Sequence, residues 1–471
     1  MDQAGATPSS PAAEATAPRR GLGPAFRNLF VANLSSSLGD GIARTATPLL
    51  AARLTDDPLL ISGVAALSML PWLFFAIPAG ILVDRIDRRR ALALASAVRT
   101  VLAVGLLALA ATDSLTIEWL FAVVFLYGVF ETVYDGAIRA ILPGVVDRPN
   151  LPRANSRIEA GELITQNFLA GPVTSTLFAV SVLIPLGGLA GAYAVAVVLA
   201  FFLPAAAAGK RQARRRAAAD RAASAPQGAT TPADDGASGP ATATTTASAG
   251  RPVTREDPDD DAPDEPWYRQ LLDGLRFILA NRMLRTLWFL STFTALCFSA
   301  AIATYVLFVL EELAVPEAWF GAFMVTAVVG GLAGTALTSR AKAALGTGGA
   351  MAVANLVAAL MLTLMGVFPS IAVAAVTFAV ANAAVIVWNV LVMSLRQSLI
   401  PDHLLGRVHG TWRTLLWGVT PLGSLLGGLL ARVDLTTPLV VGGALSAVVG
   451  LVWFRFLRSL PNPEDVEELG G

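Results

Sequence analysis

The residues of this chain that could do chemistry are acids and bases that lie inside long apolar segments. Segment 27–53 carries polar side chains that recur on one face of a helix: Asn33, Ser37, Asp40, Arg44 and Thr47. An ionisable group inside an apolar helix is costly, so each one is a candidate for function. Asp40 and Arg44 are four residues apart and can pair on the helix itself. Two interpretations stay open: Asp40 binds a proton or a substrate within a polar stripe, or it forms a structural ion pair that holds this helix to a neighbour.

A second apolar segment carries Glu131, Asp135 and Arg139 at steps of four residues. We expect Asp135 and Arg139 to form a structural pair near the end of that helix. Glu131 lies one turn deeper, beside another acid, and two neighbouring carboxylates repel each other when both are ionised. One of the two acids should therefore hold a proton, which makes Glu131 a candidate proton carrier beside Asp40.

A third segment places Glu159, Glu162 and Gln166 on one helix face, with Asn167 beside them. Glu162 is the deeper of the two acids and is the third candidate for proton coupling. When the sequence of the second half is aligned with that of the first, Arg413 aligns with Glu159. This acid and this base could therefore form a gate contact between the two halves. The candidate cavity or substrate-binding residues are polar or aromatic: Asn33, Ser37, Arg44, Gln166, Asn167, Tyr305, Trp388, Asn389 and Arg413.

The composition indicates a protein that crosses a membrane many times. Of its 471 residues 55% are hydrophobic and 14% are charged, whereas a soluble domain has about 25% charged residues. The net charge is +0, and the basic residues gather at the ends of segments rather than along a stripe. This pattern argues against nucleic-acid binding and favours a lipid bilayer as the partner.

The sequence lacks the motifs of several other functional classes. Cys297 is the only cysteine, so no intramolecular disulfide can form. The two histidines, His403 and His409, have no cluster of acids or cysteines around them that would complete a metal site. There is no nucleotide-binding loop ending in Gly-Lys-Ser/Thr and no His-Glu-x-x-His motif. We therefore expect no cofactor, no metal, no enzyme activity and no drive by ATP.

A membrane-spanning helix needs about 20 mostly apolar residues, and the sequence predicts twelve such helices. They are expected at 27–53, 59–83, 90–112, 116–140, 154–179, 183–207, 283–311, 317–340, 348–367, 370–396, 404–431 and 436–457. The predicted fold class is an all-α polytopic membrane protein, with twelve transmembrane helices in two pseudo-symmetric six-helix bundles.

The twelve helices are divided by a stretch rich in Ala, Thr, Ser, Gly and Pro that cannot bury a core. The expected parts are a disordered tail at 1–25, a first bundle at 26–208, a disordered linker at 209–265, a second bundle preceded by an interfacial helix at 266–460, and a tail at 461–471. Arginine gathers before the first helix and after the even-numbered ones, and Lys and Arg accumulate on the cytoplasmic side of membranes. Both termini and the linker are therefore assigned to the cytoplasm of a bacterial inner membrane.

The loop after the second predicted helix carries the most specific motif of the chain. It contains, in order, Gly80, Asp84, Arg85, Arg88 and Arg89. This pattern resembles the corresponding loop of the major facilitator superfamily, although Asp87 stands where that family usually has glycine. The resemblance implies that the loop controls conformational switching, with Asp84 set against the positive end of the eleventh helix.

A second resemblance concerns one branch of that superfamily. The stretch 404–423, which opens with Leu-Leu-Gly-Arg and closes with Pro-Leu-Gly, is similar to drug antiporters of the macrolide-efflux and enterobactin-exporter type. The helix-five glycine motif of antiporters keeps only its Gly-Pro step here. The residues expected to serve helix packing are Gly171, Pro172, Pro421 and Gly423.

These observations predict a monomeric secondary transporter that exports a small amphipathic compound, such as a drug or macrolide, in exchange for protons by alternating access. A siderophore or lysophospholipid carrier on the same fold is an alternative, and an acidic siderophore would favour Arg44 and Arg413 as ligands. A membrane sensor that transports nothing is the alternative from another functional class.

The predicted topology can be tested by cysteine scanning, after Cys297 has been replaced. A cysteine at Ser9 or Ala241 should stay unlabelled by a membrane-impermeant thiol reagent in intact cells and become labelled after lysis, because both positions are assigned to the cytoplasm. Labelling from outside intact cells would contradict the assignment.

Overall fold

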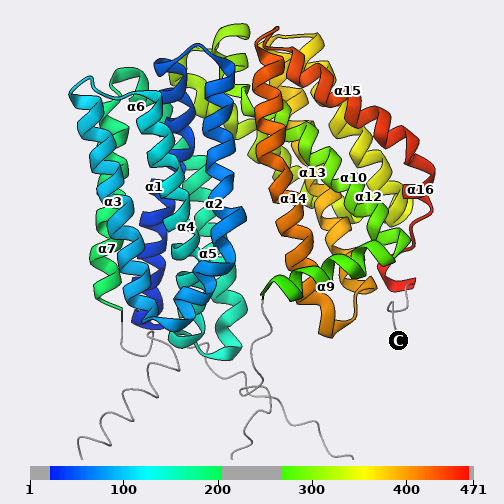
Figure 1. The fold of residues 1–471 in the computed structure, drawn as a ribbon, viewed down its shortest axis with the longest axis horizontal. Coiled ribbons are helices and arrows are strands. Elements are labelled where there is room, and N and C mark those ends of the chain that lie inside the picture. Colours follow the sequence, from blue (N-terminus) through cyan, green and yellow to red (C-terminus); the bar gives the residue numbers. More distant parts are fainter. Residues whose placement is uncertain (1–21, 204–266, 466–471) are drawn as a thin grey trace, which may run out of the picture. The chain divides into compact units, whose positions relative to one another are not determined.

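The computed structural model describes residues 22–203 and 267–465, and these residues contain helices and no strand (Figure 1). Most of the predicted tails and the whole predicted linker lie outside the described residues. Two compact units are distinguished: Met1–Gly209 together with Val306–Val328, and Lys210–Tyr305 together with Val329–Gly471.

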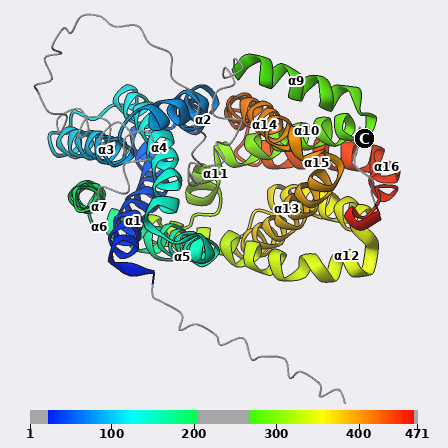
Figure 2. The same ribbon diagram turned by 90° about the horizontal axis from the view of Figure 1, so that it is seen from below.

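The first unit is built mainly from the long helices of the first half of the chain. Its elements are α1 (Gly23–Leu54), α2 (Pro58–Arg85), α3 (Arg88–Ala111), α4 (Ile117–Val145), η1 (Arg148–Asn150), α5 (Leu151–Leu163), η2 (Ile164–Leu169), α6 (Ala170–Val180) and α7 (Leu183–Phe201). The segments α5, η2 and α6 form one continuous rod, in which η2 is a π-helical segment. Helix α7 packs against both α1 and α3 (Figure 2).

An aspartate side chain caps the N-terminus of two of these helices. Asp57 precedes α2, and its carboxylate accepts a hydrogen bond from Leu59 N at 2.9 Å. Asp87 precedes α3, accepts from Arg89 N at 3.0 Å and pairs with the Arg89 guanidinium at 3.3 Å. A carboxylate at this position satisfies a free N–H group of the first helical turn. The aspartate that departs from the usual loop motif therefore serves as the N-cap of α3.

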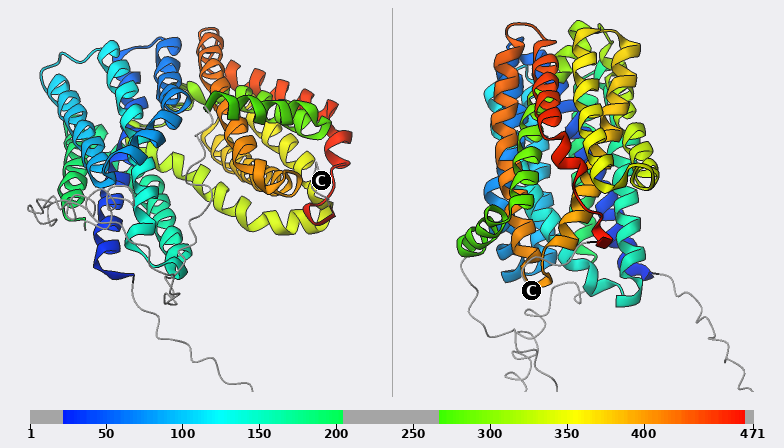
Figure 3. Two further views of the ribbon diagram at one scale, coloured as in Figure 1. Left: turned by 60° about the horizontal axis from the view of Figure 1, so that its bottom comes forward. Right: turned by 90° about the vertical axis from the view of Figure 1, so that its right-hand side faces the viewer.

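The second half of the chain contains the remaining spans. Its elements are α9 (Trp267–Ala280), α10 (Arg282–Ala303), α11 (Tyr305–Leu307), η5 (Phe308–Glu312), α12 (Glu317–Val367), α13 (Ile371–Leu399), α14 (Asp402–Ala431), α15 (Thr437–Val452), α16 (Phe454–Arg458) and η6 (Pro463–Asp465). The amphipathic α9 packs on α14 (Figure 3). At this contact Thr411 Oγ1 donates to Leu271 O at 3.1 Å.

Nine of the described helices are long and apolar enough to cross a membrane. Helix α12 is counted once but comprises two predicted spans, which meet at a non-helical Gly346 with φ of 69°. Two further helices lie outside these nine. They are α1, which carries the polar stripe, and α15, which has only 16 residues before its continuation α16. These elements account for all twelve predicted spans, and the all-helical fold of two bundles is confirmed.

Several predicted boundaries differ from the structure by a few residues, and the largest difference is at the end of the seventh span. The seventh span was expected to reach residue 311, but α10 ends at Ala303 and is followed by α11 and the π-helical η5. Hydropathy continues across this break because the residues from Tyr305 to Val309 are buried and mostly apolar. An apolar sequence pattern indicates which residues are buried, but it does not distinguish an α-helical turn from a π-helical one.

Several glycines are required because two helix backbones approach closely. A Cβ atom on Gly427 of α14 would overlap the carbonyl oxygen of Ala300 on α10. A Cβ on Gly105 of α3 would meet nothing within 4 Å. Both glycines lie inside helices, so the pair separates the effect of helix packing from that of helix propensity.

We predict that Gly427→Ala lowers the stability of the purified protein by about 1–3 kcal/mol, because a backbone carbonyl cannot rotate away from the added methyl group. Gly105→Ala is the matched control and should leave stability unchanged or raise it by about 0.5–1 kcal/mol. Thermal unfolding of both variants in detergent measures the difference. Equal unfolding midpoints would contradict the close approach of α10 and α14.

Candidate functional site

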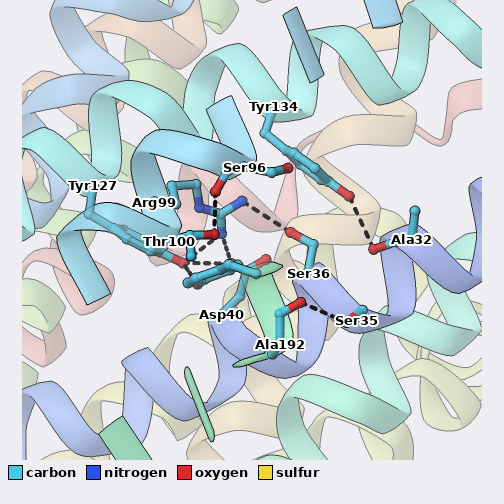
Figure 4. A network of polar contacts seen from close by, with 11 residues as sticks. Ala32, Ser35, Ser36, Asp40, Ser96, Arg99, Thr100, Tyr127, Tyr134 and Ala192 are labelled. Atoms are coloured by element: carbon cyan, nitrogen blue, oxygen red, sulfur yellow. Dashed lines mark hydrogen bonds and ion pairs between the residues drawn. The ribbon is translucent and has the colours of Figure 1, made fainter. Parts of the chain in front are cut away.

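An ion pair lies buried inside the first unit, between α1 and α3. The Arg99 guanidinium pairs with the carboxylate of Asp40, and the two side chains are 0% and 12% exposed. Arg99 also donates to Ser36 Oγ at 3.0 Å and to Tyr127 Oη at 2.7 Å (Figure 4). A guanidinium remains charged in proteins and is costly to bury alone. Asp40 therefore supplies the counter-charge that permits Arg99 to lie in the core.

Tyrosines from two other helices surround the pair. Tyr127 on α4 donates to Asp40 Oδ1 at 2.5 Å, and Tyr193 on α7 donates to the same oxygen at 2.9 Å. The Arg99 guanidinium lies 4.7 Å from the Tyr127 ring centre and 4.2 Å from that of Tyr193. A third ring, that of Tyr134, lies at 5.2 Å. Both hydrogen bonds and cation–π contacts thus hold the charges in place.

The local sequence makes room for this arrangement. Ser36 and Asp40 are one turn apart on α1, so both face Arg99. Gly39 precedes Asp40, and a Cβ atom there would overlap the ring of Tyr193. A residue larger than glycine would push α7 away and remove one hydroxyl from the carboxylate. We call Ser36, Asp40, Arg99, Tyr127 and Tyr193 the buried charge network.

The structure pairs Asp40 with Arg99 and leaves the Arg44 side chain exposed. A helical i,i+4 pair contributes only about 0.2–0.5 kcal/mol, whereas a buried guanidinium without a counter-charge costs several kcal/mol. The cost of burying Arg99 is the greater of the two, so it decides the partner of Asp40. Sequence reasoning did not select Arg99, although a signal was present: it is the only charged residue from Ala91 to Ala111.

Glu131 lies on α4, one turn from Tyr127, and is partly buried. Trp72 on α2 donates a hydrogen bond to it, and Arg99 and Arg44 are the cations close enough to act on its charge. The neighbouring acid Asp135 repels it, as the spacing predicts. The positive charge of Arg99 thus acts on both carboxylates, those of Asp40 and Glu131. Arg139 is exposed at the far end of the same row, and its pairing with Asp135 stays a prediction.

Glu162 on α5 is brought together with Asn33 on α1, where Asn33 Nδ2 donates to Glu162 Oε1 at 2.8 Å. Both residues were selected from the sequence for separate reasons. The π-helical η2 begins two residues later and carries Gln166 and Asn167. Gly41 of α1 lies against the backbone of Gln166, so the two rods touch here. π-Helical turns occur frequently at functional sites, and this one follows closely after Glu162 and carries two more of the candidate residues.

The candidates in the second half do not form a comparable group. Tyr305 is buried, lies 4.6 Å from the Phe378 ring centre and donates to Met365 Sδ at 3.5 Å. Trp388 is buried within the apolar core, so its observed contacts are packing contacts. Asn389 and Arg413 are exposed. Within the described residues no group of three or more His, Cys, Asp or Glu side chains could hold a metal ion.

The sequence matches the family model described as Major Facilitator Superfamily over residues 29–420. The chain belongs to the major facilitator superfamily. No curated protein matches the sequence of this superfamily member. Membership implies a transporter rather than an enzyme, and a small-molecule substrate.

Solved structures of transporters share the fold at low sequence identity. The nucleoside transporter NupG is 13% identical with a TM-score of 0.64, over 93% of this chain and 100% of that one. A bacterial homologue of the iron transporter ferroportin, in its inward-facing state, is 15% identical with a TM-score of 0.62, over 92% and 100%. A bacterial homologue of the lysosomal transporter Spinster is 12% identical with a TM-score of 0.58, over 92% and 95%. These likenesses concern the fold alone.

The superfamily loop after α2 is fastened to its own bundle. Arg88 donates to Ala140 O at 2.7 Å, and Arg89 donates to Leu203 O at 3.0 Å. Arg85 is exposed, and a Cβ atom on Gly80 would meet nothing within 4 Å. The side chain of Asp84 lies outside the described residues.

The proposed packing residues lie at close helix contacts. A Cβ atom on Gly321 would overlap the backbone of Gly171 and Pro172, all three within the first unit. In the second unit a Cβ on Gly423 would overlap the Leu296 carbonyl of α10, and Pro421 is buried two residues earlier.

The strength of the buried charge network can be measured with a double-mutant cycle. Asp40→Asn should destabilise the protein by up to about 3–5 kcal/mol, because Arg99 loses its paired carboxylate and keeps only Glu131, to which it is not directly bonded, as a counter-charge. The double variant Asp40→Asn with Arg99→Gln should recover much of this loss. Tyr127→Phe keeps both charges and should cost only about 0.5–1.5 kcal/mol. Additive losses in the double variant would show that the two charges are not coupled.

Proposed function

We propose that this superfamily member is a proton-coupled secondary transporter that exports a small amphipathic compound by alternating access. The observation that carries the proposal is the buried charge network with Glu131 beside it. Two carboxylates, Asp40 and Glu131, lie in the field of the fully buried guanidinium of Arg99. One positive charge neutralises one carboxylate, so the other can take up a proton without leaving a buried charge uncompensated.

Such a network gives a physical route for coupling. When Asp40 is ionised, it holds Arg99 together with the hydroxyls of Tyr127 and Tyr193. When a proton neutralises Asp40, the attraction of Arg99 turns toward Glu131 on α4. The contact between α1 and α3 then weakens while that between α3 and α4 strengthens. A proton thereby biases the packing of these helices, which is the differential interaction that a conformational switch requires.

The region around Glu162 is proposed as the substrate side of the first bundle. Glu162 and Asn33 offer a hydrogen-bonded polar pair, and Gln166 and Asn167 lie on the adjoining π-helical segment. A few polar anchors among mostly apolar side chains suit an amphipathic ligand. A carboxylate at this place favours a compound that carries a positive charge, and this preference supports the drug-antiporter branch over an acidic siderophore.

The remaining expectations are part of the same proposal. We place both termini in the cytoplasm of a bacterial inner membrane and regard the transporter as a monomer. A siderophore or lysophospholipid carrier is the second candidate, and Arg413 and Arg44 are the exposed cations that favour it. Transport of a panel of drugs and siderophores in an efflux-deficient host distinguishes these substrates. A chain that moves none of them in vesicles would support the non-transporting sensor instead.

We predict that at least one of Asp40, Glu131 and Glu162 carries the coupling proton. In proteoliposomes, Asp40→Asn, Glu131→Gln or Glu162→Gln should abolish transport driven by a pH gradient and leave exchange of the compound without a gradient. A neutral side chain cannot release and rebind the proton, although the pathway for the compound remains open.

Glu118→Gln is the matched control, because Glu118 is an exposed acid on α4, the same helix as Glu131. It should retain both kinds of transport. If all three candidate variants keep full pH-driven transport, protons are not coupled through these residues, and a sodium-driven carrier or a facilitator becomes the better explanation.

A further inference from the structure

A second arginine is buried in this protein, and it has no acidic partner among the described residues. Arg396 lies in the last turn of α13, in the second unit, and is 6% exposed. Its Nη2 lies 2.8 Å from His409 Nδ1, and its guanidinium lies 4.2 Å from the ring centre of Trp412. Its Nε is buried and bonds to nothing in the described part of the chain. Most of the five N–H donors of the guanidinium therefore remain unused.

The histidine does not compensate this charge. A guanidinium only donates hydrogen bonds, so His409 Nδ1 must be the acceptor and the ring must be neutral. The remaining proton of His409 then sits on Nε2, which is a further donor. Arg413 lies one turn beyond His409 on α14, and its charge acts on His409 together with that of Arg396. Neither His409 nor Arg413 thus offers Arg396 a negative charge.

The contrast with Arg99 shows what is missing. Arg99 is buried more completely and its Nε is likewise unbonded, but it has the carboxylate of Asp40, two hydroxyls and three aromatic rings around it. Arg396 has one aromatic ring and one neutral imidazole. A buried cation normally has an anionic partner, because its desolvation costs several kcal/mol. Since the described residues supply this partner for one of the two arginines, an external anion is the natural partner of the other.

We propose that Arg396, His409 and Trp412 form a binding site for an anionic oxygen group, either a carboxylate or a phosphate. A planar guanidinium binds both groups through parallel N–H donors, and Trp412 fixes its plane. The anion belongs either to the transported compound or to a bilayer lipid. In the first case the site rests on the proposed function and adds an acidic group to the substrate. In the second case the site anchors a lipid headgroup where α13 ends and α14 begins.

The test uses the purified full chain in nanodiscs of phosphatidylcholine, without a proton gradient. Inorganic phosphate or benzoate, compared with chloride at equal ionic strength, should raise the unfolding midpoint of the unmodified protein by about 2 °C or more. Arg396→Gln should lose this rise. Arg407→Gln is the matched control, because Arg407 lies on α14 near Asp273, at 3.9 Å, and should keep the rise.

The source of the anion is distinguished by changing the lipid. If phosphatidylglycerol nanodiscs stabilise the unmodified protein but not Arg396→Gln, the partner is a lipid headgroup. If only the soluble anions do so, the partner is the transported compound. If neither anion source stabilises the unmodified protein more than Arg396→Gln, the proposal is wrong.

Two further readouts keep the test independent of folding and of transport. Removing an uncompensated cation should leave the anion-free midpoint of Arg396→Gln equal or higher, which a purely structural arginine would not allow. His409→Ala keeps the guanidinium but removes the Nε2 donor, and it should weaken phosphate binding by about tenfold. An unchanged phosphate affinity in His409→Ala would count against the site. The proton-coupling variants of the first unit should respond to anions as the unmodified protein does, so the two proposals can fail separately.

Discussion

The first unit depends on one constraint: the guanidinium of Arg99 is fully buried and must be neutralised. This requirement brings Asp40 from α1 and the hydroxyls of Tyr127 and Tyr193 from α4 and α7 to the same point. Four helices are thereby fixed in rotation about their own axes, because a helix turned by one residue would withdraw its polar group. Lipid-facing apolar surfaces give no such specificity, since one apolar side chain contacts lipid as well as another.

The two buried arginines illustrate how one residue type can serve different roles in one fold. Arg99 is matched by protein groups and behaves as part of the architecture, while its field reaches a second carboxylate on α4. Arg396 is matched, among the described residues, by an aromatic ring and a neutral imidazole only. The first arrangement suits internal transfer of charge between carboxylates. The second suits recognition of an anion that comes from outside the chain.

Packing between helices relies on small residues wherever the backbone itself is the contact surface. Gly427 against Ala300 and Gly423 against Leu296 bring α14 to α10 in the second unit. In the first unit Gly39 and Gly41 allow α1 to approach α7 and the π-helical η2. The positions of these glycines thus serve the polar groups indirectly: Gly39 admits the Tyr193 ring, and Gly41 brings α1 close to the segment that carries Gln166 and Asn167.

The sequence by itself determined the twelve spans, the all-helical fold of two bundles and the superfamily, because apolar length and a charged loop are local properties of the chain. It also singled out Asp40, Glu131 and Glu162, since any acid in an apolar helix is conspicuous. Only the tertiary structure decided their partners. Asp40 meets Arg99 of α3 and Glu162 meets Asn33 of α1, because the distance between helices, unlike spacing along one helix, is set by packing. For the same reason Trp388, selected as a cavity residue, lies in the core, and Arg396 became visible only once its surroundings were known to lack an acid among the described residues.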